Sequence, residues 1–180
     1  MFSVLLIDGF SEDAVLVNGK TPKNICDTYL PLLEGILRFN GIGCERWVLS
    51  GIENEYAIRG RSGKNLIFLP VFSVSDRSSS DISLIYTDST APDSISFRIA
   101  KIMRRKNELS KTENVVFINP IHENDPLKSF SPIIVENVRL AADGSNENEI
   151  FKGIYKRALN TAEAICTYYF DAFENPGDFI

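Results

Sequence analysis

Histidine is almost absent from this sequence of 180 residues, in which His122 is the only one. Cysteine is scarce as well, and Cys26, Cys44 and Cys166 are widely spaced among apolar residues. An odd number of isolated cysteines excludes a disulfide framework or a zinc knuckle, and is typical of reduced cysteines in a core. We therefore expect a reducing compartment.

Long apolar runs are also missing. The first apolar run ends at Asp8 and has no basic segment before it, so it predicts neither a signal peptide nor a membrane span. We expect a soluble protein that is cytoplasmic when made.

Basic residues are in deficit, because the formal net charge is -5 and the isoelectric point is near 5.0. Nucleic-acid binding needs a basic face, so this balance argues against it. The one basic cluster, within residues 101–106, is interpreted as the solvated outer face of a helix rather than an anion site. Glycine spacing typical of a nucleotide site is absent after the first apolar run, so no nucleotide cofactor is expected.

The sequence does contain enough hydrophobic residues, 44% of the total, to form one sizeable buried core. At this length we expect a single domain over residues 1–180. Residues 4–7 predict a buried strand that ends at Asp8.

A helix is predicted next, with Thr21 as its N-cap, Pro22 at its first position and its end at Asn40-Gly41. Pro31 lies inside the pattern, so we expect it to kink or split this helix. Pro70 is expected to end a nearly all-apolar third strand.

The rest of the chain alternates between predicted strands and helices. Strands are predicted at residues 44–49, 66–71, 82–86, 115–118 and 133–135. Helices are predicted at residues 95–103 and 149–173. The second of these helices has an apolar and aromatic stripe, which we interpret as core packing. This alternation predicts an α/β fold, a three-layer sandwich with a mostly parallel central sheet.

In such folds, ligands gather at the carboxyl ends of the strands. Asp8, the segment 71–76 and Glu136 each follow a predicted strand, so we expect them at one edge. Glu136 comes after three β-branched residues, where partial desolvation should raise its pKa toward values useful for acid/base catalysis. The alternative is a structural carboxylate that accepts backbone hydrogen bonds or pairs with Arg139.

His122 lies in a polar loop beside Glu123 and Asp125. These residues could bind a metal or shuttle a proton, and the alternative is a solvated loop histidine.

The run Ser131-Pro-Ile-Ile-Val-Glu136, followed by a long helix ending in Ile165-Cys-Thr-Tyr-Tyr-Phe170, resembles the type 3 family of zinc-dependent N-acetylmuramoyl-L-alanine amidases. These enzymes cleave the lactyl-peptide amide of peptidoglycan. The strand at 82–86 with the helix that follows, and the opening strand with the first helix, are similar to elements of the same family. The resemblance spans nearly the whole chain and implies an amidase-like fold.

The resemblance also implies where a zinc site would lie. The family holds zinc with a histidine after the first strand, a glutamate near the first helix and a histidine at a later strand end. Those places fall near Phe10, in residues 20–23, and at Val71 or Phe72, where no residue can ligate zinc. The catalytic glutamate of the family has its counterpart at Glu136.

Two functional hypotheses follow, and the sequence leaves open whether the protein is an enzyme. The first, which we favour, is an amidase-like domain without zinc-dependent catalysis or cofactor that binds a peptidoglycan peptide or a protein partner, or serves in an assembly. The second is a diverged peptidoglycan hydrolase, bacterial or phage, that recruits zinc through other ligands, with Glu136 as its general base. The candidate binding residues are Asp8, Phe10, Phe72, Asp76 and His122; of these, Asp8, Asp76 and His122 are the alternative metal ligands. A third, weaker possibility is an unrelated α/β binding module.

Overall fold

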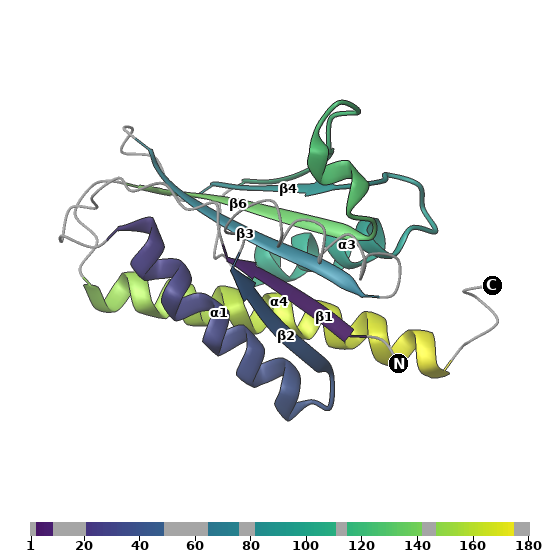
Figure 1. Ribbon diagram of the computed structural model, residues 1–180. Helices are drawn as coiled ribbons and strands as arrows, with labels where there is room; N and C mark the ends of the chain where they lie inside the picture. Colours follow the sequence, from purple (N-terminus) through teal and green to yellow (C-terminus); the bar gives the residue numbers. More distant parts are fainter. Residues whose placement is uncertain are drawn as a thin grey trace.

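The structure is a computed structural model that describes residues 3–8, 21–48, 65–75, 82–110, 115–141 and 147–174. Within these ranges, strands and helices alternate along the chain (Figure 1). The strands are β1 (Ser3–Asp8), β2 (Gly43–Val48), β3 (Leu66–Ser75), β4 (Ile82–Thr87), β5 (Val115–Pro120) and β6 (Ile133–Ala141). The helices are α1 (Pro22–Phe39), α3 (Ile95–Ser110), the short 3-10 helix η1 (Pro126–Ser129) and α4 (Glu147–Glu174).

The strands form one sheet in the order β2-β1-β3-β6-β4-β5. All neighbouring pairs are parallel except β4 with β6, so β4 and β5 run opposite to the other strands. The predicted α/β fold with a mostly parallel central sheet is therefore confirmed. Of the two outer layers of the predicted three-layer sandwich, the described residues form one from long helices and the other from the segment around η1.

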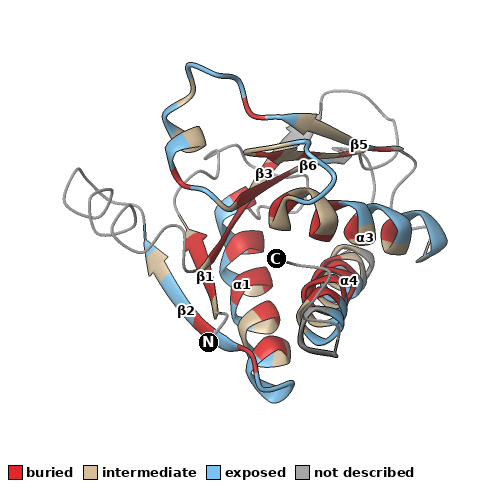
Figure 2. Ribbon diagram, turned by 90° about the vertical axis from the view of Figure 1, so that its right-hand side faces the viewer, coloured by how far each residue is buried: buried red, intermediate tan, exposed pale blue. Residues whose placement is uncertain are grey.

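The helices α1, α3 and α4 all pack on one face of the sheet, where the larger apolar core lies (Figure 2). A second, smaller core lies on the opposite face, where Ile121, Leu127 and Phe130 of the segment around η1 cover β1, β3 and β6. The helix-covered face is the one that concerns the candidate site, because Glu136 lies on it.

Helix α1 begins and ends where the sequence predicts. Thr21 is the N-cap in a capping box, and Asn40 is the C-cap, followed by Gly41 with a φ of +79°. Of the kink or split expected at Pro31, the split is wrong, because α1 runs unbroken through this residue. Pro31 and Asp27 are both exposed, so the Asp27 carbonyl that loses its helical donor can be solvated instead.

Two strands are longer than predicted. Pro70 does not end β3, which continues to Ser75. β1 pairs with β3 only as far as Phe68. On the β1 side of β3, the missing N–H of Pro70 therefore interrupts no backbone hydrogen bonds between strands. β6 likewise continues past Val135 to Ala141, paired with β3 along its length.

The predicted half-buried strand β4 is present, but its buried positions are Ser83, Ile85 and Thr87. The apolar residues on which the prediction was based, Ile82, Leu84 and Tyr86, lie on the other face and are only partly buried. The stripe along α4 is largely core, as predicted, with the exception of Tyr155, which is 54% exposed.

All three cysteines are outside disulfides, with Cys26 and Cys44 buried and Cys166 partly exposed. Burial raises the pKa of the Cys44 thiol to about 12, so it stays protonated.

Among the helices that the structure describes, none is both long and apolar enough to cross a membrane.

Candidate functional site

Glu136 lies inside β6 rather than at the strand end that the sequence predicted. Leu6, Phe68 and Ile134 are aligned across β1, β3 and β6. Two residues further on, Asp8 and Glu136 therefore lie at the same level of the sheet, on the helix-covered face. β6 continues beyond Glu136 because it stays paired with both β3 and β4.

The Glu136 side chain is 0% exposed, and both carboxylate oxygens have partners on helices. The Tyr29 hydroxyl of α1 lies 2.9 Å from Oε2, and the Arg157 guanidinium of α4 lies 3.4 Å from Oε1. The Tyr29 oxygen is also 3.0 Å from the Thr161 hydroxyl, one helical turn after Arg157. The carboxylate thus connects β6 to α1 and α4, and its cation is Arg157 rather than the exposed Arg139.

Burial raises the pKa of Glu136 to about 7, and the hydrogen bond from Tyr29 acts in the opposite direction. The direction agrees with the sequence prediction of a desolvated carboxylate. Burial, together with the nearby Glu136 charge, raises the pKa of Tyr29 well above its ordinary value, so Tyr29 keeps its proton.

Aromatic rings fill the space beside Glu136. The Tyr29 ring packs edge-on against Phe72, with ring centroids 5.5 Å apart, and lies 6.4 Å from the Phe68 ring. All three side chains are fully buried. Phe72 was a candidate binding residue, and the structure places it in the core, where it is inaccessible to a ligand.

Asp8 is the candidate carboxylate on the same face of the sheet as Glu136. β3 lies between their strands, and β1 pairs with β3 only as far as Leu6 and Phe68, two residues before Asp8. The Asp8 carboxylate is partly exposed, and its Oδ1 lies 3.7 Å from the buried Cys26 thiol of α1. Asp8 and Glu136 share a face of the sheet, but Asp8 lies at a strand end and Glu136 does not, and they have separate partners.

His122 lies at the other end of the sheet. It follows β5, and β5 runs opposite to β1 and β6, so the loop lies near the start of β6 rather than beside Asp8. His122 is exposed, and its Nδ1 accepts a hydrogen bond from the Asn124 N–H. Glu123 pairs with Lys128, and Asp125 caps η1. These contacts fit the solvated-loop interpretation.

The remaining predicted positions divide into two groups. Phe10 and Asp76 lie outside the described residues, as do residues 9–20. Val71 and Lys23 fall at ligand places implied by the resemblance. Val71 is partly exposed, Lys23 is exposed, and neither carries a zinc-binding group. In the part of the chain that the structure describes, no three His, Cys, Asp or Glu side chains come together to hold a metal.

The basic cluster on α3 is a solvated helix face, as predicted. Lys101 lies over the Phe97 ring, Arg104 pairs with Glu108, and Lys106 pairs with Glu163 of α4.

Sequence reasoning missed Tyr29, Arg157 and Thr161. Each lies on the apolar face of a predicted helix, and a polar residue on such a face needs a buried partner. That signal could have marked them, but it does not say which strand residue they contact.

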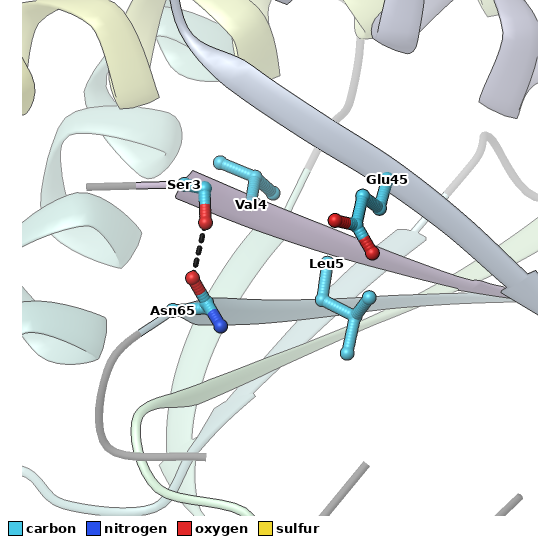
Figure 3. Close-up of a pocket in the computed structure, with 5 residues that line it drawn as sticks. All are labelled: Ser3, Val4, Leu5, Glu45 and Asn65. Atoms are coloured by element: carbon cyan, nitrogen blue, oxygen red, sulfur yellow. Dashed lines mark hydrogen bonds between the residues drawn. The ribbon is translucent and has the colours of Figure 1, made fainter. Parts of the chain in front are cut away.

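The structure also has a hollow of about 260 Å³, lined by Ser3, Val4, Leu5, Glu45 and Asn65 (Figure 3). It lies at the amino-terminal ends of β1 and β3, where the Ser3 hydroxyl donates to Asn65. This end is opposite to the carboxyl ends where ligands gather in parallel sheets.

Several amidases of known structure have this fold. The CwlD amidase from Clostridioides difficile, in complex with the GerS lipoprotein, matches with a TM-score of 0.67 and 16% identity, covering 96% of this chain and 98% of that one. The amidase AmiC2 of Nostoc punctiforme matches with a TM-score of 0.67 and 14% identity, covering 93% and 97%. Ami1 from Mycobacterium smegmatis matches with a TM-score of 0.68 and 12% identity, covering 95% and 97%.

No protein-family model and no curated protein matches this sequence. At such low identities, the structural matches show a shared fold and not a shared activity. The chain therefore has the fold of the N-acetylmuramoyl-L-alanine amidases, as the resemblance implied.

Proposed function

We propose that this chain is an amidase-like domain without zinc-dependent catalysis, which binds a peptidoglycan peptide or a protein partner, or serves in an assembly. The burial of Glu136 carries the proposal. A general base must come within hydrogen-bond reach of the water that it activates. Glu136 is 0% exposed, and both its oxygens already face Tyr29 and Arg157, so it has no open side for a water and a substrate amide.

The residues at the implied zinc positions support the same proposal. A catalytic zinc needs about three protein ligands from His, Cys, Asp or Glu. At the later strand end, Phe72 packs against Tyr29 in the core, and the neighbouring Val71 has no donor atom. These residues do not fit zinc, so we derive no hydrolytic step from it.

The diverged hydrolase receives less support from the geometry. It would bring His122 and Asp8 to one metal, with Glu136 as the base. Asp8 lies beside the carboxyl end of β1, whereas His122 follows β5 at the opposite end of the sheet. The two side chains belong to separate surroundings, and neither contacts Glu136.

A role in binding is consistent with the fold. CwlD, one of the amidases that share it, has been solved in complex with the GerS lipoprotein. An amidase fold can thus present a surface to a protein partner. We propose that this chain retains such a binding role, with the core beside Glu136 filled by side chains.

The test is an amidase assay on a soluble muropeptide, with zinc added, monitoring release of the stem peptide by chromatography. We expect no release above the blank from the wild type, and the same result from Glu136→Gln. The matched control is Glu163→Gln, at an exposed glutamate of α4. Zinc-stimulated release that Glu136→Gln abolishes and Glu163→Gln retains would contradict the proposal. Co-sedimentation with purified sacculi then tests peptidoglycan as the bound partner.

A further inference from the structure

The buried polar cluster of Glu136, Tyr29, Thr161 and Arg157 joins three elements through a continuous chain of contacts. Glu136 comes from β6, Tyr29 from α1, and the other two from α4. All four are at most 4% exposed. Helices α1 and α4 thus contact the same carboxylate of the sheet in the interior of the protein.

The central hydroxyl of this chain has two hydrogen-bonding neighbours but only one proton. The Tyr29 oxygen lies 2.9 Å from Glu136 Oε2 and 3.0 Å from Thr161 Oγ1. Because one hydroxyl donates to one acceptor at a time, the other contact must have its proton supplied from the neighbour. Two arrangements satisfy every group.

In the first arrangement Glu136 is ionised, Tyr29 donates to it, and Thr161 donates to Tyr29. In the second, Glu136 has taken one proton from water and donates it to Tyr29, and Tyr29 donates to Thr161. The Thr161 proton then turns to another acceptor, such as the carbonyl four residues earlier that a helical threonine can reach. The heavy atoms keep their places, and the direction of the chain reverses.

We propose that this cluster is a pH-responsive latch, in which uptake of one proton by Glu136 reverses the hydrogen-bond chain and removes the cost of a buried charge, so that the folded domain is more stable at lower pH. The proposal concerns the packing of the domain and stands apart from the question of catalysis.

The groups that face Glu136 act in both directions. From α1 it meets Tyr29, and from α4 Arg157, whose guanidinium is 3.4 Å away; both favour the charged carboxylate. At the same level, β3 and β4 present Pro70 and Ile85, which cannot stabilise a charge. On the same face of the sheet lies the Asp8 carboxylate of β1. The Cys26 thiol of α1 lies beside Asp8. Burial outweighs the favourable contacts and raises the Glu136 pKa to about 7.

The sign of the effect follows from linkage. In the unfolded chain a glutamate has a pKa of about 4.3, and in the folded chain that of Glu136 is higher. The folded form therefore binds the proton more tightly, and the contribution to stability is fully present below about pH 4 and is lost as the pH rises through the folded pKa. One such group changes the unfolding equilibrium constant by at most about tenfold per pH unit.

The experiment is urea unfolding of the whole chain at pH 5, 6, 7 and 8, for the wild type, Glu136→Gln and the control Glu163→Gln. The glutamine keeps an acceptor for Tyr29 and has no proton to gain. We expect the ratio of the wild-type to the Glu136→Gln unfolding constant to rise by at least tenfold between pH 5 and pH 8. The Glu163→Gln ratio should stay flat. A ratio for Glu136→Gln that also stays flat overturns the proposal.

A second measurement keeps the proposal testable if Glu136→Gln does not fold. Carbon NMR of wild type labelled at the glutamate carboxyl and tyrosine Cζ positions follows the groups directly. We expect one carboxyl resonance to titrate near neutral pH, together with one tyrosine resonance over the same range. Titration of every glutamate below about pH 5.5, the range of ordinary carboxyls, would refute the latch.

Discussion

The hydroxyl of Tyr29 offers a direct test of how much the buried cluster contributes to stability. Tyr29→Phe keeps the ring, which packs against Phe72 and Phe68, and removes only the oxygen. Its loss leaves Glu136 Oε2 and Thr161 Oγ1 without this partner inside the protein. A hydrogen bond to a charged group contributes about 1.5–3 kcal/mol, and one between neutral groups about 0.5–1.5 kcal/mol.

The expected loss therefore depends on pH. At pH 8 Glu136 is mostly ionised, and we expect Tyr29→Phe to lower the free energy of unfolding by about 2–4.5 kcal/mol, the sum of one charged and one neutral bond. At pH 5 the carboxyl is protonated and both bonds are neutral, so we expect about 1–3 kcal/mol. The change is larger at high pH because the hydroxyl stabilises the carboxylate more than the acid.

The assay is urea unfolding followed by far-ultraviolet circular dichroism. The matched control is Tyr155→Phe on α4, whose side chain is 54% exposed and outside the cluster. Its effect should stay within about 0.5 kcal/mol at both pH values. If Tyr29→Phe behaves like Tyr155→Phe, or costs more at pH 5 than at pH 8, the reasoning about Glu136 is wrong.

Two further changes test the core and the first helix. Phe72→Ala should lower the free energy of unfolding by about 3–5 kcal/mol, because it empties a fully buried aromatic site beside Tyr29. The control Phe117→Ala, at a residue that is 54% exposed, should lower it much less. Equal losses for the two variants in urea unfolding would mean that Phe72 is not in the core. Pro31→Ala should stabilise the chain by about 1–2 kcal/mol, because it restores a hydrogen bond within α1, and this gain exceeds the entropy that proline removes from the unfolded chain. A lower thermal midpoint for Pro31→Ala would show that α1 needs the proline.

Much of the fold could be predicted from local signals. The end of β1 at Asp8 and both caps of α1, at Thr21 and Asn40-Gly41, depend on residues close together in the sequence. The same holds for the alternation of strands and helices that predicts the sandwich. These features need no knowledge of distant contacts.

The errors came from effects between distant segments. Pro70 was expected to end β3, but the strand goes on because its remaining neighbour β6 keeps pairing with it. β4 buries its polar alternate residues because pairing with β6 and β5 fixes its orientation. Such tertiary pairing overrides local propensity, and the local sequence does not show it.

The candidate site was predictable only in part. Desolvation of Glu136 followed from the β-branched residues before it, and the raised pKa agrees. Its partners did not follow, because Tyr29 is 107 positions and Arg157 21 positions away in the sequence. The polar character of a buried helix position shows that a partner exists, but only the three-dimensional structure identifies it.

The most direct test of the central claim, that this amidase-like chain does not use zinc, is the metal content of the purified protein. The protein is dialysed against buffer containing trace zinc, then against metal-free buffer, and analysed by elemental mass spectrometry, with an active zinc amidase treated in parallel. We predict far less than one zinc per chain, because Phe72 and Val71 cannot serve as ligands. Near-stoichiometric zinc that survives dialysis would contradict the account and return Glu136 to the role of a catalytic base.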